Sequence, residues 1–106
     1  MTFLADCPTR TGLDLVSGTW TLVVMHALRD TAKRPRALRE EIGGISAKSL
    51  NETLRRRERN RLVRHVKIAE APPRVDYHLT ELGRGLLLAL DPLAAWVAEH
   101  ESELPT

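Results

Sequence analysis

The stretch Ile45–Arg59 constrains the fold most, because it opens with a helix-capping serine and closes almost entirely in arginine. The Ser46 oxygen can accept one of the unpaired N–H groups in the first turn of a helix. At 100° per residue Leu50 and Leu54 share one face, and the opposite face carries Lys48, Glu52, Arg55 and Arg59. One face is therefore suited to packing. The other is suited either to an anionic partner or simply to water.

The residues before this stretch complete a helix-turn-helix pattern. Pro35 suits the first position of a helix that buries Leu38 and Ile42, and Gly43-Gly44 supply a sharp turn. Two short helices separated by such a turn have the spacing of a helix-turn-helix, with the second helix as the recognition helix.

After the recognition helix the spacing of apolar residues changes from the three to four residues of a helix to the two-residue alternation of a strand. Residues 62–68 and 74–79 predict two short strands, and the second alternates apolar with polar side chains. Pro72 and Pro73 cannot donate to a ladder, so we place them at a projecting hairpin tip. A hairpin directly after a helix-turn-helix is a wing.

The N-terminal part predicts two helices. Pro8 suits the start of a short helix that ends at Ser17-Gly18. Thr19 is expected to cap the next helix, Trp20–Arg29, whose apolar side chains cover most of its circumference. That helix should be the centre of the core, and a polar link, Asp30–Arg34, follows it.

The C-terminal helical region, which begins at Thr80, carries more apolar surface than one small domain needs. The surplus suggests a second copy of the chain packed on an interface. The residues predicted to form it are Leu86, Leu90, Leu93, Trp96 and Val97. Pro92 leaves two alternatives: it kinks one helix, or Asp91 caps a second helix with Pro92 at its first position.

Length and charge limit the class of protein. The 106 residues fit one domain, divided into N-terminal and core helices (8–29), a helix-turn-helix (35–61), a wing (62–79) and a C-terminal dimerisation helix or helices (80–104). Residues 1–67 carry fourteen Lys or Arg against seven Asp or Glu, whereas residues 68–106 carry two against seven. The basic part should face a polyanion. With no apolar run of membrane-spanning length and no secretion signal, we expect a cytoplasmic protein without a membrane partner.

These residues together resemble the HxlR-type winged helix-turn-helix transcriptional regulators of bacteria. The match covers nearly the whole chain. Its most specific motifs are Gly18-x-Trp20-Thr21, Gly44-Ile45-Ser46 and Pro72-Pro73-Arg74-Val75-x-Tyr77-x-Leu79-Thr80-x-x-Gly83.

The resemblance implies a mainly α fold with a small β-hairpin (α+β), a winged helix-turn-helix whose terminal helices form a homodimer. Such a dimer would place two recognition helices in successive major grooves of an inverted-repeat operator in double-stranded DNA. The family often controls responses to oxidants, aldehydes or electrophiles, which implies a small-molecule or electrophile effector.

Three positions depart from the family pattern. Arg57 stands on the Leu50 side of the recognition helix, where the family usually has an apolar residue, so that helix would pack loosely or let Arg57 reach out to water. Pro35 replaces a usual aromatic residue. Asn60-Arg61 lacks the usual helix-ending glycine, and we expect Asn60 to take the left-handed conformation.

The recognition helix divides into two sections. Its first half, with Ser46 as cap, places side chains at base edges, with Asn51 suited to adenine and Lys48 to guanine. The side chains of this half are Lys48, Ser49, Asn51 and Glu52, and those of the second half, suited to phosphate, are Arg55, Arg56 and Arg59. For each residue the alternative is a solvated side chain.

The wing adds one predicted DNA contact. Arg74 is expected at the DNA backbone or minor groove, and the alternative is an ion pair with Asp76 or Glu70.

Cys7 is a candidate redox sensor. It precedes a helix N-terminus and lies three residues from Arg10, and both features favour thiolate, whereas Asp6 opposes it. The family resemblance implies an oxidant or electrophile sensor that can bridge two subunits. The alternative is an idle thiol, because the chain has no second cysteine.

Other chemistries have no motif in the sequence. The four histidines show no metal-ligand spacing, no phosphate loop or catalytic triad is present, and we expect no metal, cofactor or enzymatic activity. The tryptophans, Trp20 and Trp96, suit core or dimer anchors. We therefore expect a dimeric DNA-binding regulator that acts as a repressor. The alternative is a winged-helix protein-interaction module without specific DNA binding.

Overall fold

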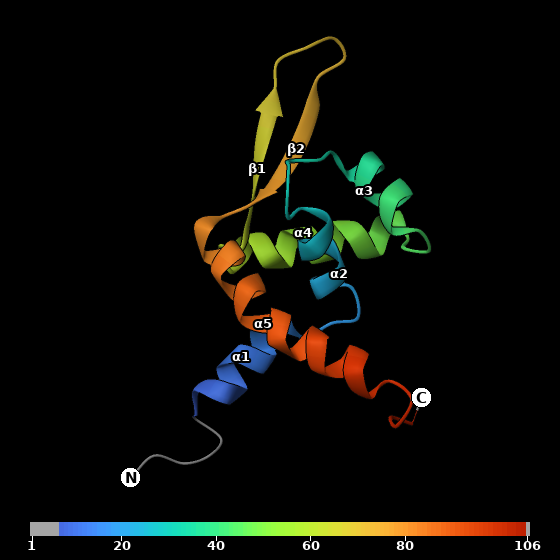
Figure 1. The fold of residues 1–106 in the computed structure, drawn as a ribbon. Coiled ribbons are helices and arrows are strands. Elements are labelled where there is room, and N and C mark those ends of the chain that lie inside the picture. The colour runs from blue at the N-terminus through green and yellow to red at the C-terminus, as the bar shows by residue number, and fades with distance from the viewer. Residues whose placement is uncertain (1–6, 106) are drawn as a thin grey trace.

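The computed structural model describes residues 7–105, and its elements follow the order of a winged helix-turn-helix (Figure 1). The helices and strands are α1 (Pro8–Val16), α2 (Thr21–Ala27), α3 (Pro35–Ile42), α4 (Ala47–Arg59), β1 (Val63–Ile68), β2 (Arg74–Leu79) and α5 (Glu81–His100). The predicted mainly α fold with a β-hairpin is confirmed. The hairpin projects from one end of the molecule, and α1 and α5 lie toward the other end.

Local sequence signals fix the helix-turn-helix. Pro35 occupies the first turn of α3, as expected, and α3 ends where Gly43 takes φ 70° and Gly44 takes φ 81°. Both angles lie in the left-handed region that glycine adopts without a Cβ penalty. Ser46 then caps α4, its Oγ accepting from the Ser49 N–H at 3.0 Å. The turn and the start of the recognition helix are therefore as predicted.

The core gathers around α2, as predicted. Val24, Met25 and Leu28 are fully buried. Around them lie buried apolar residues of the other elements: Leu38, Ile45, Leu50, Leu54, Leu62, Val63, Leu79 and Leu87.

The bounds of α2 differ from the prediction. The helix begins at Thr21 and ends at Ala27, with Trp20 in the N-cap position, so Thr19 does not cap it. The reason is that Thr21 Oγ1 donates to the Ser17 carbonyl at 2.8 Å. This bond holds the chain before the helix, so α2 begins one residue later than the predicted Trp20.

The wing is an antiparallel hairpin of β1 and β2, with Val63 opposite Leu79 and Ile68 opposite Arg74. Lys33, which was expected in an irregular link, forms an isolated bridge with Tyr77. The Lys33 N–H donates to the Tyr77 carbonyl at 2.9 Å, and the Tyr77 N–H returns the bond at 2.8 Å. The link before α3 thus supports the wing.

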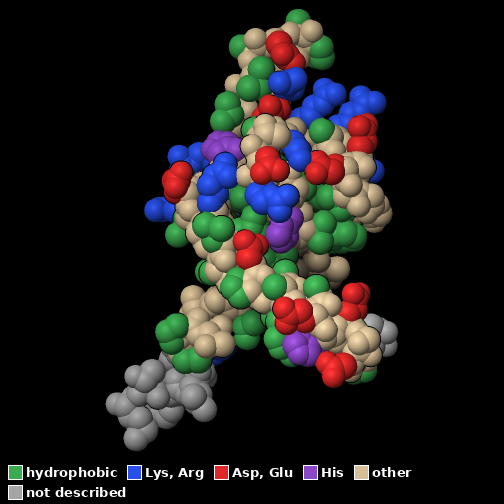
Figure 2. All heavy atoms as spheres, viewed as in Figure 1, with side chains coloured by type: hydrophobic (Ala, Val, Ile, Leu, Met, Phe, Trp, Pro, Cys, Tyr) green, Lys and Arg blue, Asp and Glu red, His purple; other side chains and the backbone are tan. Residues whose placement is uncertain are grey.

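Helix α5 is continuous, with Pro92 inside it. This excludes the alternative of a second helix capped by Asp91. Thr80 caps the helix as predicted, its Oγ1 accepting from the Gly83 N–H at 3.0 Å. The charge asymmetry of the sequence is visible in space, because Lys and Arg gather around the wing and the helix-turn-helix, and acidic side chains surround the end of α5 (Figure 2).

Candidate nucleic-acid interface

Helix α4 presents two chemically different faces. Leu50, Leu54 and Arg57 are buried. The exposed side chains are Lys48, Asn51, Glu52, Arg55, Arg56 and Arg59. Ser49 is half-buried, and the Ser46 hydroxyl is already used as the helix cap. The structure therefore brings most of the predicted contact residues to one accessible surface, which we call the α4 face.

The cations of the α4 face have no counter-ions within residues 7–105. Lys48, Arg55, Arg56 and Arg59 make no hydrogen bond or ion pair through their side chains there, and Glu52 makes none either. A surface with several unpaired cations and one carboxylate attracts anions. Its charge is available to an anionic partner without breaking internal ion pairs.

The end of α4 differs from the prediction. Asn60 keeps a right-handed conformation, with φ −79° and ψ −2°, and Arg61 takes the left-handed one, with φ 63°. The Arg61 N–H donates to the Glu58 carbonyl and the Leu62 N–H to the Arg57 carbonyl, both at 2.9 Å. These two bonds satisfy carbonyls of the last turn, and they place the left-handed residue one position later than expected.

Arg57 does not reach solvent, which excludes one of its two predicted alternatives, that of reaching out to water. The residue is 2% exposed, and its Nη1 donates to the Leu15 carbonyl of α1. Burial lowers the pKa of Arg57 from its ordinary value. The side chain points inward because a backbone acceptor 42 residues away in the sequence lies within its reach.

Glu58 joins the recognition helix to the wing, and sequence reasoning missed this role. Its Oε2 lies 2.6 Å from His65 Nδ1 and accepts from the His65 N–H at 3.0 Å. The only sequence signal for this contact was a single carboxylate, Glu58, between Arg57 and Arg59 in a run of arginines. The contact fixes the direction in which β1 leaves α4.

At the wing, Arg74 makes the ion pairs that were the alternative to DNA contact. Its Nη1 lies 3.3 Å from Glu70 Oε1, and its Nε lies 3.2 Å from Asp76 Oδ1. Two other wing cations, Arg64 and Lys67, are exposed and make no such pair within the described chain. Sequence reasoning did not single them out, although both lie on the first strand.

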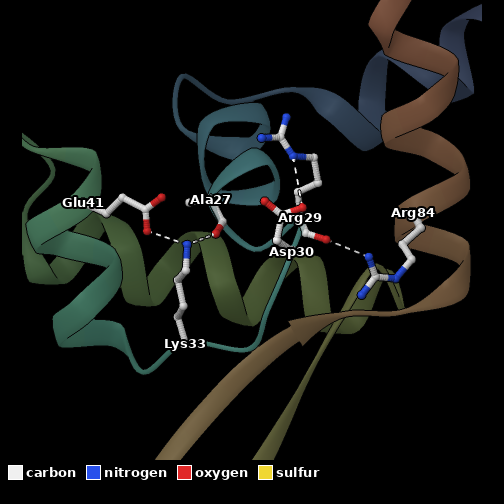
Figure 3. A network of polar contacts seen from close by, with 6 residues as sticks. All are labelled: Ala27, Arg29, Asp30, Lys33, Glu41 and Arg84. Carbon is white, nitrogen blue, oxygen red and sulfur yellow. Dashed lines mark hydrogen bonds and ion pairs between the residues drawn. The ribbon is translucent and has the colours of Figure 1, made fainter.

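A polar network holds the helix-turn-helix against its neighbours (Figure 3). Lys33 Nζ donates to the Ala27 carbonyl and to Glu41 Oε2, both at 2.5 Å. From α5, Arg84 Nη1 donates to the Arg29 carbonyl at 2.7 Å. These contacts fix α3 and α5 to the end of α2.

Cys7 lies half-buried immediately before α1. The thiol makes no capping hydrogen bond, but the N–H of Arg10, which donates to the Cys7 carbonyl at 3.1 Å, favours the thiolate and lowers the pKa of Cys7. The sequence suggests that the charge of Arg10 contributes to this preference for thiolate. In the structure the backbone N–H of Arg10 favours the thiolate. Asp6, which was expected to oppose it, lies outside the described residues.

The predicted interface residues of α5 differ in exposure. Leu93, Trp96 and Val97 are 53%, 50% and 40% exposed. Leu90 is half-buried, and Leu86 packs against the core of its own chain. Two further exposed leucines of this helix, Leu82 and Leu88, were not among the predicted interface residues. Close to the start of α5 lies an apolar hollow of about 350 Å³ lined mainly by Leu15, Leu62, Leu82 and Leu86.

Of the tryptophans, Trp20 is half-buried against the core, whereas Trp96 stacks on His100 with ring centroids 4.6 Å apart. Within residues 7–105, no group of three or more His, Cys, Asp or Glu could hold a metal ion. No helix in the described part of the chain has the length and apolar character needed to cross a membrane.

Both the sequence and the fold are similar to those of known transcriptional regulators. The family model of HxlR-like helix-turn-helix proteins matches residues 15–104. YtfH of Escherichia coli K12, an uncharacterized HTH-type transcriptional regulator, is 34% identical over 95 residues, which are 90% of this chain and 75% of YtfH. Solved structures of similar fold include two regulators in their reduced forms. The reduced redox regulator HypR has a TM-score of 0.83 and 27% identity, covering 90% of this chain and 94% of its own. Reduced YodB from Bacillus subtilis has a TM-score of 0.78 and 34% identity, covering 86% and 90%.

Proposed function

The chain belongs to the HxlR-like helix-turn-helix family of transcriptional regulators, and from this premise we propose that it is a dimeric, sequence-specific binder of double-stranded DNA that acts as a repressor. The observation that carries the proposal is the α4 face. Its cations are exposed and unpaired in the described chain, while the opposite side of the same helix is buried. A duplex supplies phosphates at regular spacing and base edges in a groove wide enough for a helix.

The two halves of α4 have separate roles in this proposal. Asn51 and Lys48, near the capped end, can donate to base edges and so distinguish sequences, with Ser46, Ser49 and Glu52 beside them. Arg55, Arg56 and Arg59 bind phosphate, which adds affinity without sequence information. Arg74 can join them only by exchanging its two carboxylate partners for phosphate. We therefore expect Arg74 to contribute less than Arg59.

The dimer is proposed to form through α5. Three predicted interface residues, Leu93, Trp96 and Val97, leave large apolar side chains in water in a single chain. Burying them against a second copy gains the free energy of apolar burial. Sedimentation equilibrium should give twice the chain mass of 11.9 kDa, and a monomer at micromolar concentration would contradict the dimer.

Cys7 is proposed as the sensing group. The lowered pKa raises the thiolate fraction, and the thiolate is the form that reacts with oxidants and electrophiles. Two similar proteins, the redox regulator HypR and the transcriptional regulator YodB, were solved in their reduced forms. This similarity supports a redox reaction of Cys7. Diamide should release wild-type protein from DNA and leave Cys7→Ser bound. Identical release of both proteins would end the sensor proposal.

The DNA proposal is tested by footprinting on DNA from around the chain's own gene, repeated at several salt concentrations. We expect a protected inverted repeat and an affinity that falls steeply with salt, because bound cations displace counter-ions from phosphate. A reporter placed behind that site should lose expression when the protein is present. If no specific footprint is found at moderate salt, the chain is better explained as a protein-interaction module.

A further inference from the structure

Helix α1 is weakly embedded in the fold. None of its residues is buried, and Leu13 on its surface is 63% exposed. Apolar packing normally supplies most of the stability of a helix this short. Its position must therefore depend strongly on specific polar contacts at its ends.

The C-terminal end of α1 is capped from other parts of the chain. The last four carbonyls of a helix have no partner inside the helix, and a cation near them is favoured by the helix dipole. Ser17 Oγ donates to the Asp14 carbonyl at 2.9 Å. The next carbonyl, that of Leu15, accepts from Arg57 Nη1 of α4. Helix α1 has no basic residue in its own last turn, so Arg57 supplies the missing charge.

Stability alone does not explain an arginine at this position. Arg57 is 2% exposed, and its Nε is buried without a hydrogen-bond partner. A buried, partly unsatisfied guanidinium is costly, and apolar side chains of similar size often replace buried charges without loss of stability. What an apolar side chain cannot do is bind the Leu15 carbonyl and so tie α1 to α4.

We propose that Arg57 is a positioning residue that caps α1 from the recognition helix, so that a displacement of α1 is transmitted to α4. The connection is continuous, because Cys7 immediately precedes α1, Leu15 lies in its last turn, and Arg57 lies in the second half of α4. A change at Cys7 thereby reaches the helix that carries the α4 face. The consequence for DNA rests on the proposed function, whereas the capping contact does not.

The capping contact is tested by hydrogen–deuterium exchange of the full chain. Arg57→Leu should make the amides of α1 exchange about tenfold faster, because the charged hydrogen bond is lost, while the melting temperature does not fall. Arg57→Lys should restore slow exchange in part, since its ammonium can still donate to the Leu15 carbonyl. Arg56→Leu removes the same charge from the exposed side of α4 and should leave the exchange of α1 unchanged.

Transmission is tested by alkylating Cys7 with iodoacetamide and measuring the affinity for the footprinted DNA. In wild type the affinity should change several-fold, and in Arg57→Leu by less than about twofold. Equal changes in both proteins, or none in wild type, would overturn transmission. Unchanged α1 exchange in Arg57→Leu, or faster exchange throughout the chain with a lower melting temperature, would overturn the positioning role. A protein that binds no DNA would contradict the proposed function instead, and the exchange experiment would still decide the role of Arg57.

Discussion

Gly83, near the start of α5, lies against the backbone carbonyl of Leu62, between α4 and β1. A Cβ at this position would lie 2.2 Å from the Leu62 carbonyl oxygen, which is backbone and cannot turn aside. The same carbonyl accepts from the Thr80 N–H at 3.1 Å, so moving it would break the junction between β2 and α5. Glycine is needed here for space.

Gly83→Ala should lower the free energy of unfolding by about 3 kcal/mol, because the clash displaces either the helix or the Leu62 carbonyl. The matched control is Gly85→Ala in the same helix, where an added Cβ meets no atom within 4 Å. That substitution should raise the free energy of unfolding by about 0.5 to 1 kcal/mol. Urea unfolding measures both. Equal effects of the two substitutions would refute the close approach.

Single residues were predictable where their reason is local. The Ser46 cap and the Gly43-Gly44 turn follow from neighbours a few residues away, and both are confirmed. Helical spacing placed Arg57 on the Leu50 side of α4, but its hydrogen bond was not predictable, since the acceptor lies 42 residues away. The left-handed residue after α4 was misplaced because asparagine tolerates that conformation better than arginine, yet Arg61 adopts it.

At the scale of elements, the two halves of α4 should separate in mutants. Lys48→Ala or Asn51→Ala should reduce the preference for the specific site over random duplex about tenfold, because one base contact contributes roughly 1 to 3 kcal/mol. Arg59→Ala should weaken all duplexes alike and lower the salt slope by about one. Competition anisotropy measures both effects. If all three variants lost specificity and affinity in the same proportion, the division of the helix would be wrong.

The spacing of apolar residues predicted the helices and strands better than it predicted the contacts between them. The strands of the wing and all five helices were predicted close to their bounds. The bridge between Lys33 and Tyr77 and the contact between Glu58 and His65 were missed, because they join segments whose proximity is set by tertiary packing. The sequence did not decide whether Pro92 lies inside one helix or starts a second one, since Asp91-Pro92 is compatible with both structures.

At the scale of the whole molecule, the unpaired basic side chains and the exposed apolar side chains lie at different ends. Unpaired cations gather near the wing and α4 (Figure 2), and most of the large exposed apolar side chains of the described residues belong to α5. The charge asymmetry in the sequence anticipated this division. It could not give the distance between two α4 faces in a dimer, because that depends on how two copies pack.

The most direct test of the account is an anisotropy titration of wild-type protein with the footprinted inverted repeat and with the same duplex after one half-site is scrambled. The account predicts two chains bound per intact repeat, an affinity at least about tenfold lower for the scrambled duplex, and a steep loss of affinity with salt. Equal affinity for both duplexes and for random DNA, or a single chain bound per repeat, would contradict it.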